Sequence, residues 1–158
     1  MKKIVLSLLM IAALTVSCKK EAKATDAENV AVATETATTY KVDTATSVID
    51  WIGSKPAGQH TGTISLSSGE ISLNNGVVES GKFVINMGSI TVTDLKVEEG
   101  KEKLEHHLKG TSEDAAADDH FFNTKKFPEG TFEITKVTAN EGVNTIEGNL
   151  TLKGITKN

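Results

Sequence analysis

The 158-residue sequence contains no arginine: its 17 cationic side chains are all lysine, against 21 acidic ones, for a net charge of -4. The planar guanidinium fork grips phosphate with two hydrogen bonds, so its absence argues against a nucleic-acid or nucleotide partner. One cysteine excludes a disulfide framework and a four-cysteine zinc site. Two prolines and 13 glycines exclude a collagen-like or proline-rich chain, and the length favours one domain.

The N-terminus has the pattern of a secretory signal. Lys2 and Lys3 precede a nearly continuous apolar run over residues 4–16, which is shorter than the roughly 20 residues that span a bilayer. Cys18 follows at the expected cleavage point, as in a bacterial lipoprotein signal, although Thr15 stands where the usual leucine would be. The alternative is ordinary secretion with an incidental cysteine.

We therefore expect residues 1–17 to be a lipoprotein signal peptide, removed after export through the Sec pathway. Cys18 would carry acyl chains and hold the protein in the cell envelope, facing the periplasm, with the outer membrane as the expected membrane. Residues 18–38 lack a stable apolar period and predict a flexible tether. The globular domain is then expected over residues 39–158.

From residue 40 onward, apolar and polar residues alternate with the period of β-strands. Asn75-Gly76 supplies the positive φ angles of a type I′ hairpin turn. The turn-forming residues at 56–58 and 67–69 predict two further breaks between strands. The pattern over residues 77–90 predicts one long strand. Strict alternation over residues 145–152 indicates strands with one dry and one wet face, as in an antiparallel sheet.

One helical interruption is expected near residues 98–109. Leu104 and Leu108 are four apart, and Gly110 fits the left-handed position that follows a helix. The fold class predicted is therefore all-β, an antiparallel sheet that closes into a barrel or stacks as a sandwich, with one short helical excursion. An eight-stranded barrel is just wide enough to enclose one elongated small ligand.

An ordered set of motifs covers most of residues 39–158. It comprises Tyr40-Lys41-Val42-Asp43, Ser47, the Trp51 strand, Gly81-Lys82-Phe83, Met87-Gly88-Ser89-Ile90, His107-Leu108-Lys109, Phe121-Phe122-Asn123, Phe127-Pro128, Thr131-Phe132 and the segment from Gly148 to Lys157. In this set the sequence resembles the YceI-like family of secreted bacterial domains.

The resemblance implies a lipocalin-like barrel that binds a long isoprenoid or another amphiphilic lipid, such as an isoprenoid quinone, for transport or storage. Family domains continue past the Gly-Ile-Thr-Lys segment with further strands, whereas this sequence stops at Asn158. The expectation is a shortened sequence or a barrel lacking its last strands. The segment between Lys109 and Phe121 is also longer than in members where the paired phenylalanines follow closely.

The candidate ligand-binding residues are apolar and lie on the inward positions of the expected strands or beside them. They are Trp51, Ile64, Phe83, Ile85, Met87, Phe121, Phe122, Phe132, Ile146 and Leu150. Such a site needs area burial and few polar contacts. The alternative is that the same residues fill the core of an interaction module that has no ligand.

The candidate metal ligands are the four histidines, His60, His106, His107 and His120. A weaker third hypothesis is a periplasmic metal-binding protein that uses His106, His107 and His120. Neighbours on a helix point about 100° apart, so His106 and His107 cannot both face one ion. Spacing places no third ligand, and we predict no metal and no resident cofactor. No nucleophile motif or nucleotide loop is present, so an enzyme is not predicted; a homodimer is compatible with the sequence.

Overall fold

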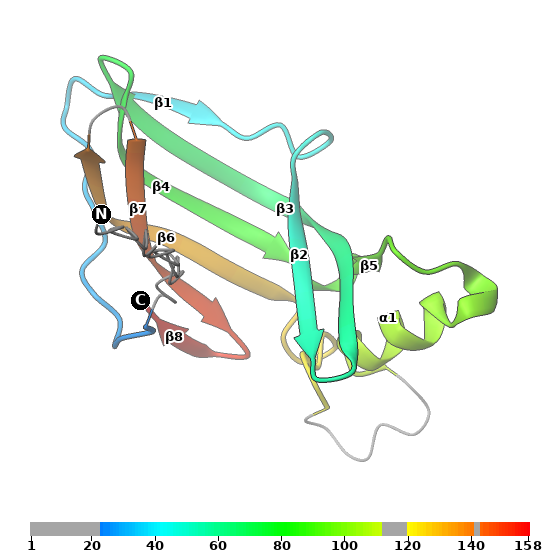
Figure 1. The fold of residues 1–158 in the computed structure, drawn as a ribbon. Helices are drawn as coiled ribbons and strands as arrows, with labels where there is room; N and C mark the ends of the chain where they lie inside the picture. Colours follow the sequence, from blue (N-terminus) through cyan, green and yellow to red (C-terminus); the bar gives the residue numbers. More distant parts are fainter. Residues whose placement is uncertain (1–22, 112–119, 141–142) are drawn as a thin grey trace, which may run out of the picture.

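The computed structural model describes residues 23–111, 120–140 and 143–158. These residues form one antiparallel sheet of eight strands, with one α-helix beside it (Figure 1). The strands are β1 (Thr38–Lys41), β2 (Val48–Lys55), β3 (Gly58–Asn74), β4 (Val77–Asn86), β5 (Thr91–Val92), β6 (Glu129–Asn140), β7 (Val143–Leu152) and β8 (Ile155–Lys157). The predicted all-β class is confirmed, but as a sheet that curves without closing.

The long strand β3 holds the two parts of the sheet together. Its first half pairs with β2 and β5, and its second half pairs with β1 and β4; the order then continues through β6 and β7 to β8. The turn predicted at residues 67–69 is wrong. A β-bulge between Leu66 and Ser68 bends β3 there and leaves it continuous, as Figure 1 shows.

Other turn predictions are confirmed. Asn75 and Gly76 have φ angles of 50° and 79° and join β3 to β4, and Pro56-Ala57 separates β2 from β3. The strand predicted over residues 77–90 ends early, at Asn86, because a short 3₁₀ turn, η1 (Met87–Ser89), follows. The Asn86 side chain accepts the Gly88 amide at 3.1 Å and starts that turn.

The predicted helix is divided in two. A 3₁₀ turn, η2 (Val97–Glu99), is followed by Gly100 with a φ of 94°, and only then by α1 (Lys101–Lys109). Gly110 is left-handed, with a φ of 70°, and its amide closes the last turn on the carbonyls of His106 and His107, as the sequence predicts. Among the described residues, no helix has the length and apolar character needed to cross a membrane.

The core lies where the concave face of the sheet meets α1 and Phe122. Ile64, Ile85, Met87 and Ile90 are buried together. Partly buried side chains pack around them: Trp51, Leu66, Leu108, Phe122 and Leu152. The strands that contribute to this core turn one apolar face inward, as the alternation predicts.

Part of the segment predicted as a tether lies against the sheet. Thr25 and Asn158 exchange two backbone hydrogen bonds of 2.7 and 3.0 Å. The Asn149 side chain accepts the Glu28 amide at 2.9 Å and donates to the Glu28 carbonyl at 2.7 Å. Further along, the Ala31 amide donates to the Ile134 carbonyl. Cys18 and the predicted signal peptide, residues 1–17, are outside the described residues.

We expect Asn149→Ala to release this docked segment while leaving the sheet intact. Asn149 is buried, and its loss would remove both hydrogen bonds to the Glu28 backbone, worth about 0.5–1.5 kcal/mol each. Amide hydrogen exchange should rise at residues 25–31 and stay unchanged in β4. Asn144→Ala, on an exposed site of the same strand, is the matched control. Equal exchange in both variants would contradict the assignment.

Acid should loosen the same segment near Thr34. The Glu79 carboxylate accepts the Thr34 amide at 2.7 Å and its hydroxyl at 2.8 Å, and these bonds hold the pKa of Glu79 below its ordinary 4.5. A lowered pKa means that the contact is favourable above pH 4.5 and is lost as pH falls below it. The Thr34 amide resonance should titrate with a midpoint under 4.5, and Glu79→Gln should abolish that titration. A midpoint at or above 4.5 would refute this prediction.

Candidate functional site

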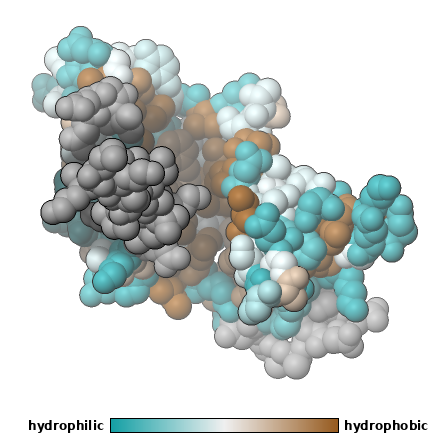
Figure 2. Space-filling view, in the orientation of Figure 1, coloured by the Kyte–Doolittle hydropathy of each residue, from teal (hydrophilic) through white to brown (hydrophobic). Residues whose placement is uncertain are grey.

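The concave face of the sheet encloses an apolar cavity of about 500 Å³. Figure 2 shows hydrophobic surface gathered along the hollow in the middle of the molecule. The lining residues come from β2, β3, β4, β6, β7, α1 and the turns beside them. They are Ile49, Trp51, Ile52, Gly53, Ile64, Ile85, Met87, Ile90, Leu108, Phe121, Phe122, Phe132, Leu150 and Leu152.

Eight of the ten predicted ligand-binding residues line this cavity: Trp51, Ile64, Ile85, Met87, Phe121, Phe122, Phe132 and Leu150. Phe83 and Ile146 do not. The Phe83 ring packs against Phe132, with 6.4 Å between centroids, and Ile146 lies opposite Val137 in the sheet. The structure thus brings most of the set together, while the role of these residues in binding stays a prediction.

Six lining residues were not predicted for the site: Ile49, Ile52, Gly53, Ile90, Leu108 and Leu152. Ile49 and Leu152 could have been found by counting two residues from Trp51 and Leu150, because alternate residues share a face of a strand. Leu108 and Ile90 line the cavity because α1 and the turn after β4 pack beside the sheet. No local sequence pattern predicts that packing.

Two glycines leave room for large aromatic rings that line the wall of the cavity. Trp51 on β2 stands opposite Gly62 on β3, and a Cβ at Gly62 would overlap both the indole ring and the Thr91 carbonyl. In the same way, a Cβ at Gly148 would overlap the Phe132 ring. Each glycine therefore lets an aromatic side chain lie flat over the neighbouring strand.

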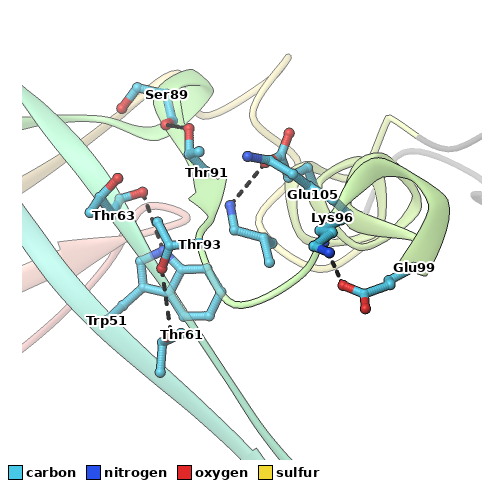
Figure 3. Close-up of polar contacts among 11 residues, drawn as sticks. Trp51, Thr61, Thr63, Ser89, Thr91, Thr93, Lys96, Glu99 and Glu105 are labelled. Atoms are coloured by element: carbon cyan, nitrogen blue, oxygen red, sulfur yellow. Dashed lines mark hydrogen bonds and ion pairs between the residues drawn. The ribbon is translucent and has the colours of Figure 1, made fainter.

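Polar contacts behind Trp51 hold this wall in place (Figure 3). The indole N–H donates to the Thr63 carbonyl at 3.2 Å. Next to it, Thr61 and Thr93 bond across β3 and the end of β5 at 3.4 Å. The Glu105 carboxylate of α1 accepts the Val92 amide at 2.9 Å. The last bond ties α1 to β5, so the helix that carries Leu108 is fixed against the sheet.

At one end of the cavity, two aromatic residues meet two histidines. The Phe121 ring is 4.9 Å from the Phe122 ring and 5.3 Å from the His107 ring, measured between centroids. Nδ1 of His107 and Nε2 of His120 are 2.9 Å apart and share a hydrogen bond. Phe121 lines the cavity and is still 46% exposed, so it stands at an opening.

The other two histidines lie apart from this pair. His106 bonds to the Thr111 hydroxyl at 2.9 Å, and His60 pairs with Asp94 at 3.0 Å near the β2–β3 turn. Desolvation acts to raise the pKa of Asp94, but hydrogen bonds from His60 and the Thr61 backbone outweigh it and lower that pKa. Within the described part of the chain, no three histidine, cysteine, aspartate or glutamate residues come together as a metal site.

This chain is similar in sequence to known bacterial proteins over part of its length. A UPF0312 protein of Yersinia pestis (strain Pestoides F) and one of Yersinia pseudotuberculosis serotype O:1b (strain IP 31758) are each 35% identical to this chain over 69 residues. The match covers 44% of this chain and 32% of each relative, so it spans about a third of the length of these curated relatives. The profile of the YceI-like domain matches residues 40–158, and the chain therefore belongs to the YceI-like family.

Proposed function

We propose that this protein binds one elongated apolar lipid, an isoprenoid or a similar amphiphile, in the cavity of its curved sheet. The observation that carries the proposal is the cavity itself, about 500 Å³ in volume and lined by aliphatic and aromatic side chains. Ligand pockets span about 300–1,000 Å³ and are mostly apolar. At the level of the family, the YceI-like match supports a polyisoprenoid-binding protein rather than an enzyme.

The free energy of binding would come from burying apolar surface, at about 25 cal/mol per Å². An apolar cavity offers water few hydrogen-bond partners, so filling it with an apolar chain lowers the free energy. No covalent step and no metal is needed for this. Released lipid would keep its structure, which suits transport or storage.

The alternative of a filled core explains the structure less well. Side chains that would have to fill the core leave a cavity between them, and some of them stay partly exposed. Phe121 is 46% exposed and Leu150 38% exposed, although both face the cavity. A bound apolar chain would cover both residues and remove this exposed surface from water.

The carrier is further proposed to be a lipid-anchored envelope protein. The support is the sequence of residues 1–18, with its basic start, short apolar run and single cysteine. An acylated Cys18 would hold the cavity near the membrane that supplies its ligand. Metabolic labelling with an alkyne fatty acid tests this: the wild type should carry the label in the membrane fraction. Label retained by Cys18→Ser would exclude Cys18 as its site.

Native mass spectrometry of the full chain, purified from a bacterial envelope, tests the lipid-binding proposal. We expect a stoichiometric mass increase that extraction traces to one class of isoprenoid or acyl lipid. The same spectra also give the oligomeric state and so test the predicted homodimer. A folded protein of bare mass that remains empty after incubation with isoprenoid alcohols and quinones would favour a filled-core interaction module instead.

A further inference from the structure

The hydrogen-bonded pair of His107 and His120 stands next to an otherwise apolar site. Every lining residue of the cavity is aliphatic, aromatic, methionine or glycine. His107 is in ring contact with Phe121, at 5.3 Å, and directly precedes Leu108, which is also a lining residue. Phe121 is exposed, so the end of a bound chain that emerges beside it would meet the two imidazole rings.

The pair has a fixed hydrogen-bonding capacity when both rings are neutral. The bond between Nδ1 of His107 and Nε2 of His120 uses one N–H donor and one bare nitrogen. A neutral imidazole has one of each. Whichever ring donates, the two outer nitrogens, Nε2 of His107 and Nδ1 of His120, therefore present one donor and one acceptor. A hydroxyl group matches both, and a carbonyl oxygen matches the donor.

An anionic head group fits the same place poorly. A phosphate accepts several hydrogen bonds and is best held by guanidinium forks, and the chain has no arginine. The available chemistry thus favours an uncharged polar head.

We propose that His107 and His120 form the head-group end of the lipid site and select isoprenoids with an uncharged hydroxyl or carbonyl over those with a phosphate. This inference rests on the proposed lipid binding and adds the class of ligand to it. The apolar cavity would supply most of the affinity, and the histidine pair would decide which head group is accepted and in which direction the chain enters.

The chain offers its own reporter for the test. Trp51 is the only tryptophan, and its side chain lines the cavity, so its fluorescence reports filling directly. Three probes with one C20 skeleton are compared in mixed micelles: phytane without a head group, phytanol with a hydroxyl, and phytanyl phosphate. The wild type should bind phytanol at least about fivefold more tightly than phytane, the value of one net hydrogen bond, and more tightly than the phosphate.

The double variant His107→Leu/His120→Leu should bind phytane as the wild type does and lose the preference for phytanol. His106→Leu is the matched control on the same helix, because His106 bonds Thr111 and not the pair; it should keep the preference. Thermal unfolding checks that each variant is folded. If the double variant is unfolded, the single variant His107→Leu takes its place.

The outcomes separate the two proposals. A preference for phytanol that survives in the histidine variants would overturn the head-group assignment while leaving lipid binding intact. Tighter binding of the phosphate than of phytanol by the wild type would overturn the choice of an uncharged head. Failure of all three probes to enter the wild-type cavity would overturn the proposed function, and this inference with it.

Discussion

Leu150→Glu is expected to lower lipid affinity at least about 100-fold while the protein stays folded. Leu150 lines the cavity and is 38% exposed in the free protein, so a carboxylate there keeps contact with water until a lipid arrives. A bound apolar chain would then cover an ionised group that has no partner, which costs several kcal/mol. The change in Trp51 emission on adding phytanol, and the occupancy seen in native mass spectra, should both fall.

Ile155→Glu is the matched control for this change. It also puts a carboxylate in place of an aliphatic residue near the end of the sheet, but Ile155 is 66% exposed and is outside the cavity lining. Its affinity for phytanol should match that of the wild type. If Leu150→Glu also bound phytanol normally while folded, the ligand would have to lie elsewhere, and the cavity would not be the site.

Gly62→Ala is expected to destabilise the fold by about 3 kcal/mol, the upper part of the range for overpacking. The added Cβ would overlap the Trp51 ring and the backbone carbonyl of Thr91. A backbone atom in a paired strand cannot rotate away as a side chain can, so either β5 must separate from β3 or Trp51 must leave its place. The midpoint of thermal unfolding should fall by about 10 °C, with a shift in Trp51 emission.

Gly53→Ala supplies the comparison for Gly62→Ala. Gly53 also faces the Trp51 ring, but a Cβ there would lie 3.7 Å from its nearest ring atom, an ordinary contact. Its unfolding midpoint should stay within about 2 °C of the wild type, since near-neutral changes are the norm where no clash arises. Equal loss of stability in both variants would mean that the space beside Trp51 does not explain the requirement for glycine at position 62.

Local chemistry made several features of the fold predictable. Asn75-Gly76 turns the chain because these residues tolerate the positive φ angles that a tight hairpin needs. Gly110 ends α1 for a similar reason. The alternation of apolar and polar residues predicted inward positions for Trp51, Ile85 and Leu150, because alternate residues of a strand share one face. Each of these signals is contained in a few neighbouring residues.

Features that depend on distant partners were not predictable in this way. The segment 67–69 has turn-forming residues, yet β3 continues through it because β1 and β4 pair with its second half. Residues 25–31 have the composition of a solvated tether, yet Asn149, more than a hundred residues away, binds the backbone of Glu28 among them. In both places tertiary hydrogen bonds override the local preference.

The sequence by itself determined the class of this protein: alternating strands, an apolar inward face, family motifs and a chain without arginine. Only the tertiary structure decided that the inward side chains leave a cavity instead of meeting, because a volume between strands depends on the curvature of the whole sheet. It also brought His107 and His120 within 2.9 Å of each other beside Phe121. Thirteen positions separate these histidines in the chain, and they lie side by side where the amides of Phe122 and Thr124 bond to the carbonyls at the end of α1.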